Sequence, residues 1–203
     1  MEGSLERVRR VMALEKPDRA PLFDLVPNDA VLRHFNDGEP VGVGDDEAGL
    51  RALAAAVDGS RWAQFSPAAE KSGRREDGRA QRTERWTEWT ETRSYGSSEA
   101  YREAKERELA ERRRSAGAPI ETAQDETYRR NREALSRAGD DFYFLLAAPS
   151  PGLMDIWLEV GLEEFSYYLY DCEDLIEEQL ELNTDYACRW LAGLPEDDPF
   201  EAV

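Results

Sequence analysis

The sequence of 203 residues has only two cysteines and one histidine, and this scarcity excludes two kinds of architecture. Cys172 and Cys188 can form at most one bond, so the chain is not a disulfide scaffold. Structural zinc sites need close pairs of cysteine or histidine ligands, which are missing. We therefore expect free thiols, no metal site, and no cofactor that the residues of this chain identify. His34, beside Phe35, is interpreted as an ordinary packed or surface residue.

Long apolar runs and basic residues are also scarce. No stretch approaches the roughly 20 apolar residues that a membrane span requires, and the start, Met-Glu-Gly-Ser, lacks the pattern of a signal peptide. Lysine and arginine together number 26 against 44 acidic residues, and the formal net charge is −18. Such a chain repels phosphate backbones and anionic membranes. The composition disfavours nucleic acid and membrane partners and predicts a soluble, cytoplasmic protein.

What is present is an alternation of helical and apolar segments typical of an α/β architecture. A helix capped by Ser4 and ended by Pro17 leads into a short apolar strand over 20–26. A second apolar run, 142–148, is bounded by acids and Pro149, as expected for a strand buried on both faces of a parallel sheet. Further helices are predicted over 28–35, 45–57, 151–161, 162–172 and 174–194, and a further strand over 60–66.

Residues 70–96 differ in character from their surroundings. Asp77-Gly78 is a strong tight-turn dipeptide, so this region is predicted to form a β-hairpin. Trp86 and Trp89 lie three residues apart, and strict alternation would place them on opposite faces. A bulge, or burial of both faces, would reconcile the two tryptophans.

The stretch from 97 to 139 is overwhelmingly charged and helical in propensity. Its sparse apolar residues, such as Tyr101 and Leu109, form only a thin stripe. We therefore expect a solvated helical cover here rather than core.

Two segments resemble the uroporphyrinogen decarboxylase (URO-D) family. "ERVRRVMALEKPDRAPLF" resembles the family's N-terminal helix, "PDR.P" junction and first barrel strand. "FYFLLAAPSPGLMDIWLEVGLEEF", from 142, resembles its middle strand, turn and helix. The resemblance implies a partial TIM (β/α)8-type barrel, helix-rich, with a β-hairpin excursion. The chain would be one incomplete barrel domain, 1–203, with a charged hairpin and helical insertion over 70–140 and a frayed tail over 195–203.

The same resemblance bears on activity. The family includes porphyrin decarboxylases and methyltransferases that act on corrinoid proteins and thiols. The decarboxylase "M-R-Q-A-G-R-Y" stretch is replaced here by "VPNDAVLRHF", and the decarboxylase tyrosine has no counterpart. These departures favour a corrinoid (cobalamin)-linked, methyltransferase-like protein without the C-terminal half of its barrel. The alternatives are a decarboxylase fragment and a non-catalytic remnant or subunit.

The resemblance also implies partners. A small-molecule substrate is expected, and an incomplete barrel would need a complementary half or form a homo-oligomer, since open strand edges invite association. A corrinoid protein or zinc is implied only by the methyltransferase branch. The zinc-binding His-x-Cys and distant Cys of that branch have no counterpart in these residues.

Candidate site residues follow the two main strands, where barrels place functional groups. Asp24 ends the first strand and is a weak catalytic candidate, the alternative being an acid paired with Arg19 or Arg33. Asp155 is the other weak catalytic candidate, because it lies four residues before Glu159 on a predicted helix and could form a pair of acids with it. The alternative is that both are ordinary solvated acids on a helix surface. The turn after the middle strand offers backbone amides for an anion. The candidates for substrate binding are Asn28, Arg33, Ser150 and Gly152.

Overall fold

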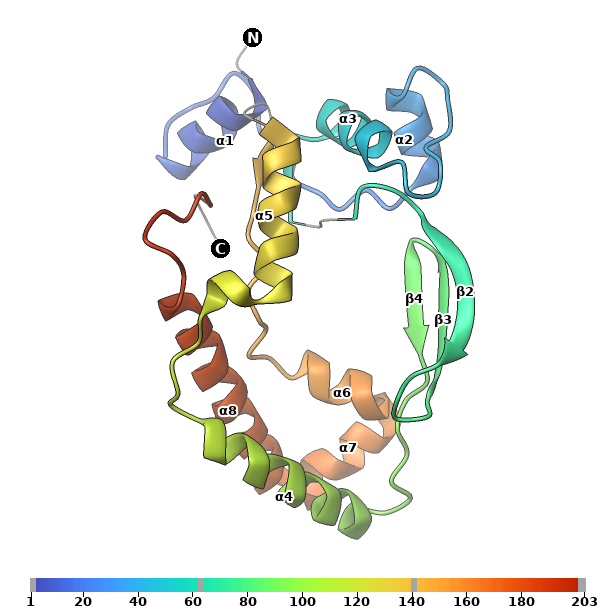
Figure 1. Cartoon of the computed structure of the whole chain (residues 1–203), viewed down its shortest axis with the longest axis vertical. Helices are drawn as coiled ribbons and strands as arrows, with labels where there is room; N and C mark the ends of the chain where they lie inside the picture. Colours follow the sequence, from blue (N-terminus) through green and yellow to red (C-terminus); the bar gives the residue numbers. More distant parts are fainter. Residues whose placement is uncertain (1–2, 62–63, 140–141, 201–203) are drawn as a thin grey trace.

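The computed structural model describes residues 3–61, 64–139 and 142–200. It is a mixed α/β protein, rich in helix, with two small sheets that do not close. Figure 1 shows an upper part with α1, α2, α3 and α5, a lower part with α4, α6, α7 and α8, and the β2–β4 sheet at one side. The helices are α1 (Ser4–Met12), α2 (Asp29–Phe35), α3 (Asp46–Ala56), α4 (Ser98–Ser115), α5 (Glu126–Ala138), α6 (Met154–Val160), α7 (Leu162–Asp171) and α8 (Glu173–Ala192), and a 3-10 turn covers Thr122–Gln124.

Three segments run parallel in the upper part. Strand β1 (Gly59–Ser60) pairs with β5 (Tyr143–Phe144), and Phe23 forms a parallel bridge with Gly59 on the other side of β1. The two apolar segments predicted as strands therefore point the same way, with β1 between them. Both are shorter than predicted, since β5 covers Tyr143–Phe144 and the first segment takes part through the bridge at Phe23. In the first segment, Pro21 has no amide hydrogen to donate to a ladder. Part of the strand predicted over 60–66 falls on 62–63, outside the described residues.

Helix α1 ends earlier than predicted. It stops at Met12 rather than at Pro17, because Leu14 adopts a left-handed conformation with φ of 60°. The Glu15 amide donates to the Arg10 carbonyl at 2.7 Å and the Leu14 amide to the Val11 carbonyl at 2.9 Å. This is the Schellman pattern of helix termination, here without glycine.

A buried carboxylate, Asp58, joins α1 to the parallel segments. Asp58 is fully buried just before β1 and accepts hydrogen bonds from Arg7 and from both terminal nitrogens of Arg19, at 2.6 and 2.9 Å. It also accepts from the Leu22 amide at 2.8 Å. Arg7 in turn donates to Asp18 at 2.7 Å. The basic helix and the following Pro-Asp-Arg junction thus fold back on one acid that sequence reasoning did not single out.

The first residue of α1 also belongs to this junction. Gly3 is the N-cap of the helix, so the prediction that Ser4 caps it is wrong. The Ser4 side chain is hydrogen-bonded to Asp58 instead. A hydroxyl that satisfies a buried carboxylate gains more than one that caps an exposed helix start.

The predicted hairpin is present and gains a third strand. Strands β2 (Ala68–Arg74), β3 (Ala80–Arg85) and β4 (Thr87–Thr90) form an antiparallel sheet in that order. Gly78 takes a φ of 85° in the predicted turn. Trp86 lies at the β3–β4 reversal and packs on the upper core, whereas Trp89 is exposed. The chain reversal, rather than a bulge or double burial, separates the two tryptophans.

The lower part has a core of its own, which corrects the prediction for 97–139. Tyr101 and Leu109 of α4 are completely buried, and the Tyr101 ring stacks on Tyr168 with ring centroids 4.0 Å apart. A thin apolar stripe is enough because α6, α7 and α8 all close over it. The upper core gathers apolar residues of α2, α3, α5 and β5.

The chain returns to the upper core near its end. Phe200 packs against Tyr128 and Phe144, with ring centroids 6.0 and 6.4 Å apart, and the Tyr128 hydroxyl lies 3.0 Å from Asp198. Asp198 and Phe200 belong to the segment 195–203 that was predicted as a frayed tail. Residues 201–203 of that segment lie outside the described residues. Within the described ranges, no helix is both long and apolar enough to cross a bilayer.

Candidate functional site

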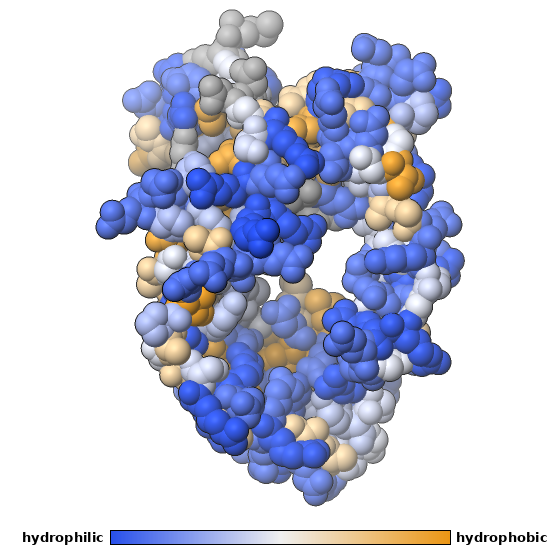
Figure 2. Space-filling view, in the orientation of Figure 1, coloured by the Kyte–Doolittle hydropathy of each residue, from blue (hydrophilic) through white to orange (hydrophobic). Residues whose placement is uncertain are grey.

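The carboxyl ends of the three parallel segments meet at one pocket. Leu25 and Pro27 follow Phe23, Arg61 follows β1, and residues 146–151 follow β5, and all of them line a cavity of about 740 Å³. In Figure 1 the chain leaves the upper part at this place and descends to α6. Figure 2 shows that the space-filling surface is open between the sheet and the rest of the molecule. In open parallel sheets, ligands bind at this edge.

The local sequence after β5 opens the pocket. The Leu145 amide donates to the Ser60 carbonyl at 2.9 Å. Beyond it, Pro149 and Pro151 have no amide hydrogen and cannot donate to a ladder. Ala147 and Ala148 have small side chains that leave room at the wall. The result is a largely apolar cavity whose lining also includes Arg61 and Ser150.

Arg61 supplies the charge of this pocket. Arg61 is exposed, and it is the one charged residue in the described lining of the pocket. Its guanidinium has no hydrogen bond or ion pair with another residue of the described ranges. A guanidinium fork matches carboxylate and phosphate oxygens. The sequence analysis missed Arg61 because it placed this residue inside the strand predicted over 60–66. The available signal was a cationic residue directly after the small residues Gly59 and Ser60.

Two of the predicted binding residues lie in the turn after β5. Ser150 lines the pocket, as its predicted position after the strand suggests. Its Oγ accepts a hydrogen bond from the Gly152 amide at 3.2 Å. The amide proposed for anion binding is thus engaged by the chain's own hydroxyl, and Gly152 acts by shaping the turn.

Asp24 and Asn28 flank the pocket residues of the first segment. The Asp24 carboxylate is exposed and accepts from the Leu25 amide at 2.7 Å. It is not paired with Arg19, whose guanidinium binds Asp58. Asn28 is the N-cap of α2, because its side chain accepts from the Ala30 and Val31 amides. The ordinary interpretation of Asn28 as a helix start is what the structure shows.

Arg33 and Asp155 lie elsewhere. Arg33 donates through Nε to the Gly38 carbonyl at 2.6 Å, at the exposed end of α2. Asp155 is exposed in the first turn of α6. Its predicted companion Glu159 is turned towards Lys105, with Oε2 2.7 Å from the ammonium nitrogen. The structure therefore does not bring Asp155 and Glu159 together as a pair of catalytic acids.

A second polar cluster is buried in the lower part. Lys105 of α4 is almost completely buried and binds Glu159 and the more exposed Glu108, at 2.7 and 2.8 Å. The Tyr95 hydroxyl donates to Glu159 at 2.9 Å, and Arg93 lies 3.1 Å from the same carboxylate. Burial lowers the pKa of Lys105, but its hydrogen bonds to both carboxylates outweigh burial, and the pKa lies above the ordinary value. Lys105 thus joins α4 to α6 through its ion pair with Glu159.

Metal and thiol chemistry find little support in the described residues. Within the described ranges, no three histidine, cysteine or acidic side chains are grouped closely enough to hold a metal ion. Burial raises the pKa of the Cys172 thiol, which points to the Ser98 carbonyl at 3.6 Å. Cys188 is exposed, and both thiols are free.

Comparisons with known proteins assign no family to this arrangement. No family model matches the chain, and neither the curated proteins nor the solved structures contain a significantly similar one. The functional interpretation therefore rests on the geometry of the pocket.

Proposed function

We propose that this protein binds a small anionic molecule at the pocket of Arg61, as a URO-D-type partial barrel of the methyltransferase-like branch. One observation carries the proposal: three parallel segments direct their carboxyl ends into a single cavity of about 740 Å³. Barrel enzymes place substrates at this end of their strands. The order of α1, the Phe23 segment, β1 and β5 is the order expected for the beginning of such a barrel.

The lining defines the ligand chemistry. Arg61 would hold a carboxylate or another anion. The apolar lining, which includes Leu25, Leu146 and Ala148, would cover an alkyl or thioether portion of the ligand. Among the described lining residues, Ser150 is the one with a side-chain hydroxyl. No side chain that could act as a general acid or base lies in the described lining. The described residues thus support substrate binding, and the reaction itself would need groups from a complementary barrel half.

The alternatives differ in their ligand. A porphyrin decarboxylase fragment would bind a tetrapyrrole with several carboxylates, and a non-catalytic remnant or subunit would need a complementary half or would only bind its ligand. Zinc, which the methyltransferase branch implies, finds no ligand set in the described residues. We therefore assign no step to it.

The Arg61→Gln variant tests the proposal. 3-Mercaptopropionate, a small thiol carboxylate, is titrated into ¹⁵N-labelled protein and the amide shifts of residues 145–148, Ser150 and Gly152 are followed. Arg61→Gln is expected to weaken binding about tenfold or more, because a charged hydrogen bond contributes about 1.5–3 kcal/mol. Arg51→Gln, at an exposed arginine of α3, is the control and should leave binding unchanged.

A parallel titration with uroporphyrin III separates the alternatives. Shifts caused by the porphyrin alone would replace the proposal with the decarboxylase interpretation. Absence of shifts with both compounds, or equal binding by Arg61→Gln and the wild type, would contradict it.

A further inference from the structure

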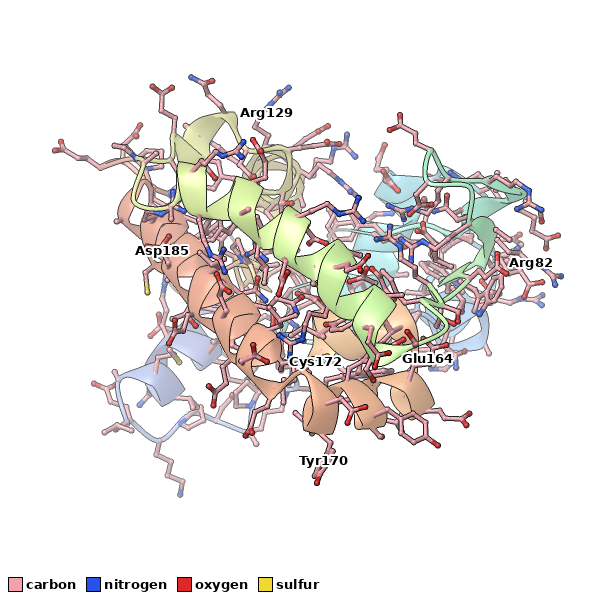
Figure 3. All side chains as sticks on the ribbon, turned by 90° about the horizontal axis from the view of Figure 1, so that it is seen from below. Arg82, Arg129, Glu164, Tyr170, Cys172 and Asp185 are labelled. Carbon is pink, nitrogen blue, oxygen red and sulfur yellow. The ribbon has the colours of Figure 1, made fainter. Side chains whose placement is uncertain are left out.

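Helix α7 turns large apolar side chains to solvent although its inner face is already buried. Phe165 and Tyr168 of this helix belong to the lower core. On the outside lie four side chains that we call the α7 solvent face: Leu162 (67% exposed), Tyr167 (61%), Leu169 (44%) and Tyr170 (88%). Figure 3, seen from below, shows Tyr170 pointing away from the molecule.

Helical spacing groups these four residues into two stripes on the outward half of α7. Tyr167 and Tyr170 lie one turn apart, and Leu162 and Leu169 lie two turns apart. Single exposed apolar residues are normal on a protein surface, but a helix of ten residues that exposes four large ones is a candidate interaction site. Tyrosine in particular is enriched at protein interfaces.

The chain on both sides of α7 carries charge of one sign, and Arg102 of α4, which reaches the end of α7, is engaged by Asp174 and the Asp171 carbonyl. The sequence contains no lysine, arginine or histidine between Arg137 and Arg189. Glu173 and Glu177, one turn apart on α8, are exposed, and their side chains have no ion pair within the described ranges. Other acids of α8 are neutralised from α4, since Asp174 binds Arg102 and Glu178 binds Arg113. The negative charge that remains therefore lies on the side of α8 that α4 does not cover.

We propose that the α7 solvent face docks a cationic amphipathic segment of a partner protein. Leucine and tyrosine side chains would receive its apolar side, and the acids of α7 and α8 would attract its lysines or arginines. A second copy of this chain fits less well, because a net charge of −18 opposes self-association. An anionic membrane is repelled for the same reason.

The test uses a fluorescein-labelled helical peptide of about 15 leucine and lysine residues, long enough to form a helix. Its binding is followed by fluorescence anisotropy. The double variant Leu162→Ser/Tyr170→Ser is expected to weaken binding about tenfold or more. The control is Leu14→Ser/Val43→Ser, which removes two other exposed apolar side chains elsewhere and should change binding less than about twofold.

Three outcomes would overturn the proposal. Equal binding by the α7 double variant and the wild type would reduce the attraction to general electrostatics. Equal binding of a peptide with glutamate in place of lysine would remove the charge argument. A concentration-dependent dimer of the wild type that the α7 double variant abolishes would make a second copy the occupant.

Discussion

Asp58→Ala is expected to lower the free energy of unfolding by about 3–5 kcal/mol, a large share of the 5–15 kcal/mol that holds a typical domain together. The substitution removes the acceptor of Arg19 and the Leu22 amide, and it takes one of its carboxylate partners from the nearly buried Arg7. Urea denaturation followed by circular dichroism measures the loss. Asp24→Ala, which removes an exposed carboxylate from the neighbouring segment, should cost less than about 1 kcal/mol. Equal costs for the two variants would contradict the role of Asp58.

The same carboxylate makes stability depend on pH. Burial, the largest single influence, raises the pKa of Asp58, but hydrogen bonds from Arg19, the Leu22 amide and Ser4 together outweigh it and the pKa lies below its ordinary value. A carboxyl with a lower pKa in the folded state stabilises above its unfolded pKa of about 3.9 and loses this contribution as pH falls through the folded pKa. The difference in stability between wild type and Asp58→Ala should therefore shrink below pH ~4.

Glu159→Ala is the second large effect, with an expected loss of about 3–5 kcal/mol. The substitution leaves the buried ammonium of Lys105 with the partly exposed Glu108 alone. Lys105→Met should cost less, about 1–2 kcal/mol, because methionine fills the same volume and Glu159 keeps Arg93 and Tyr95. Urea denaturation of both variants measures this asymmetry.

Asp155→Ala is the matched control for this cluster. It removes an exposed acid one turn earlier on α6 and should change stability by less than about 0.5 kcal/mol. A cost for Lys105→Met that exceeds the cost for Glu159→Ala would show that the lysine, rather than the carboxylate, is the indispensable member of the pair.

Local signals predicted the elements that depend on nearby residues. Helix α3 was expected over 45–57 from its acidic first turn and found at Asp46–Ala56. The Asp77-Gly78 turn was likewise found where the dipeptide indicated. The lengths of the parallel strands were overestimated, because an apolar run indicates burial but not how far ladder hydrogen bonds extend along it.

Partners distant in the sequence could not be predicted. Asp58 and Arg7 lie 51 positions apart, and Lys105 and Glu159 lie 54 apart, so neither pair has a local pattern. Tyr101 was assigned to a solvated cover because the sequence of α4 does not reveal that three other helices close over it. In the pocket, Ser150 was predicted from its place after the strand, whereas Arg61 depends on where β1 ends.

Scalar couplings across backbone hydrogen bonds test the parallel arrangement on which the pocket depends. The Tyr143 amide lies 3.0 Å from the Asp58 carbonyl and the Leu145 amide 2.9 Å from the Ser60 carbonyl, as parallel pairing of β1 and β5 requires. Nuclear magnetic resonance should detect both couplings in the wild-type protein. Their absence, with both amides exchanging as rapidly as those of exposed coil, would contradict the arrangement and with it the proposed site.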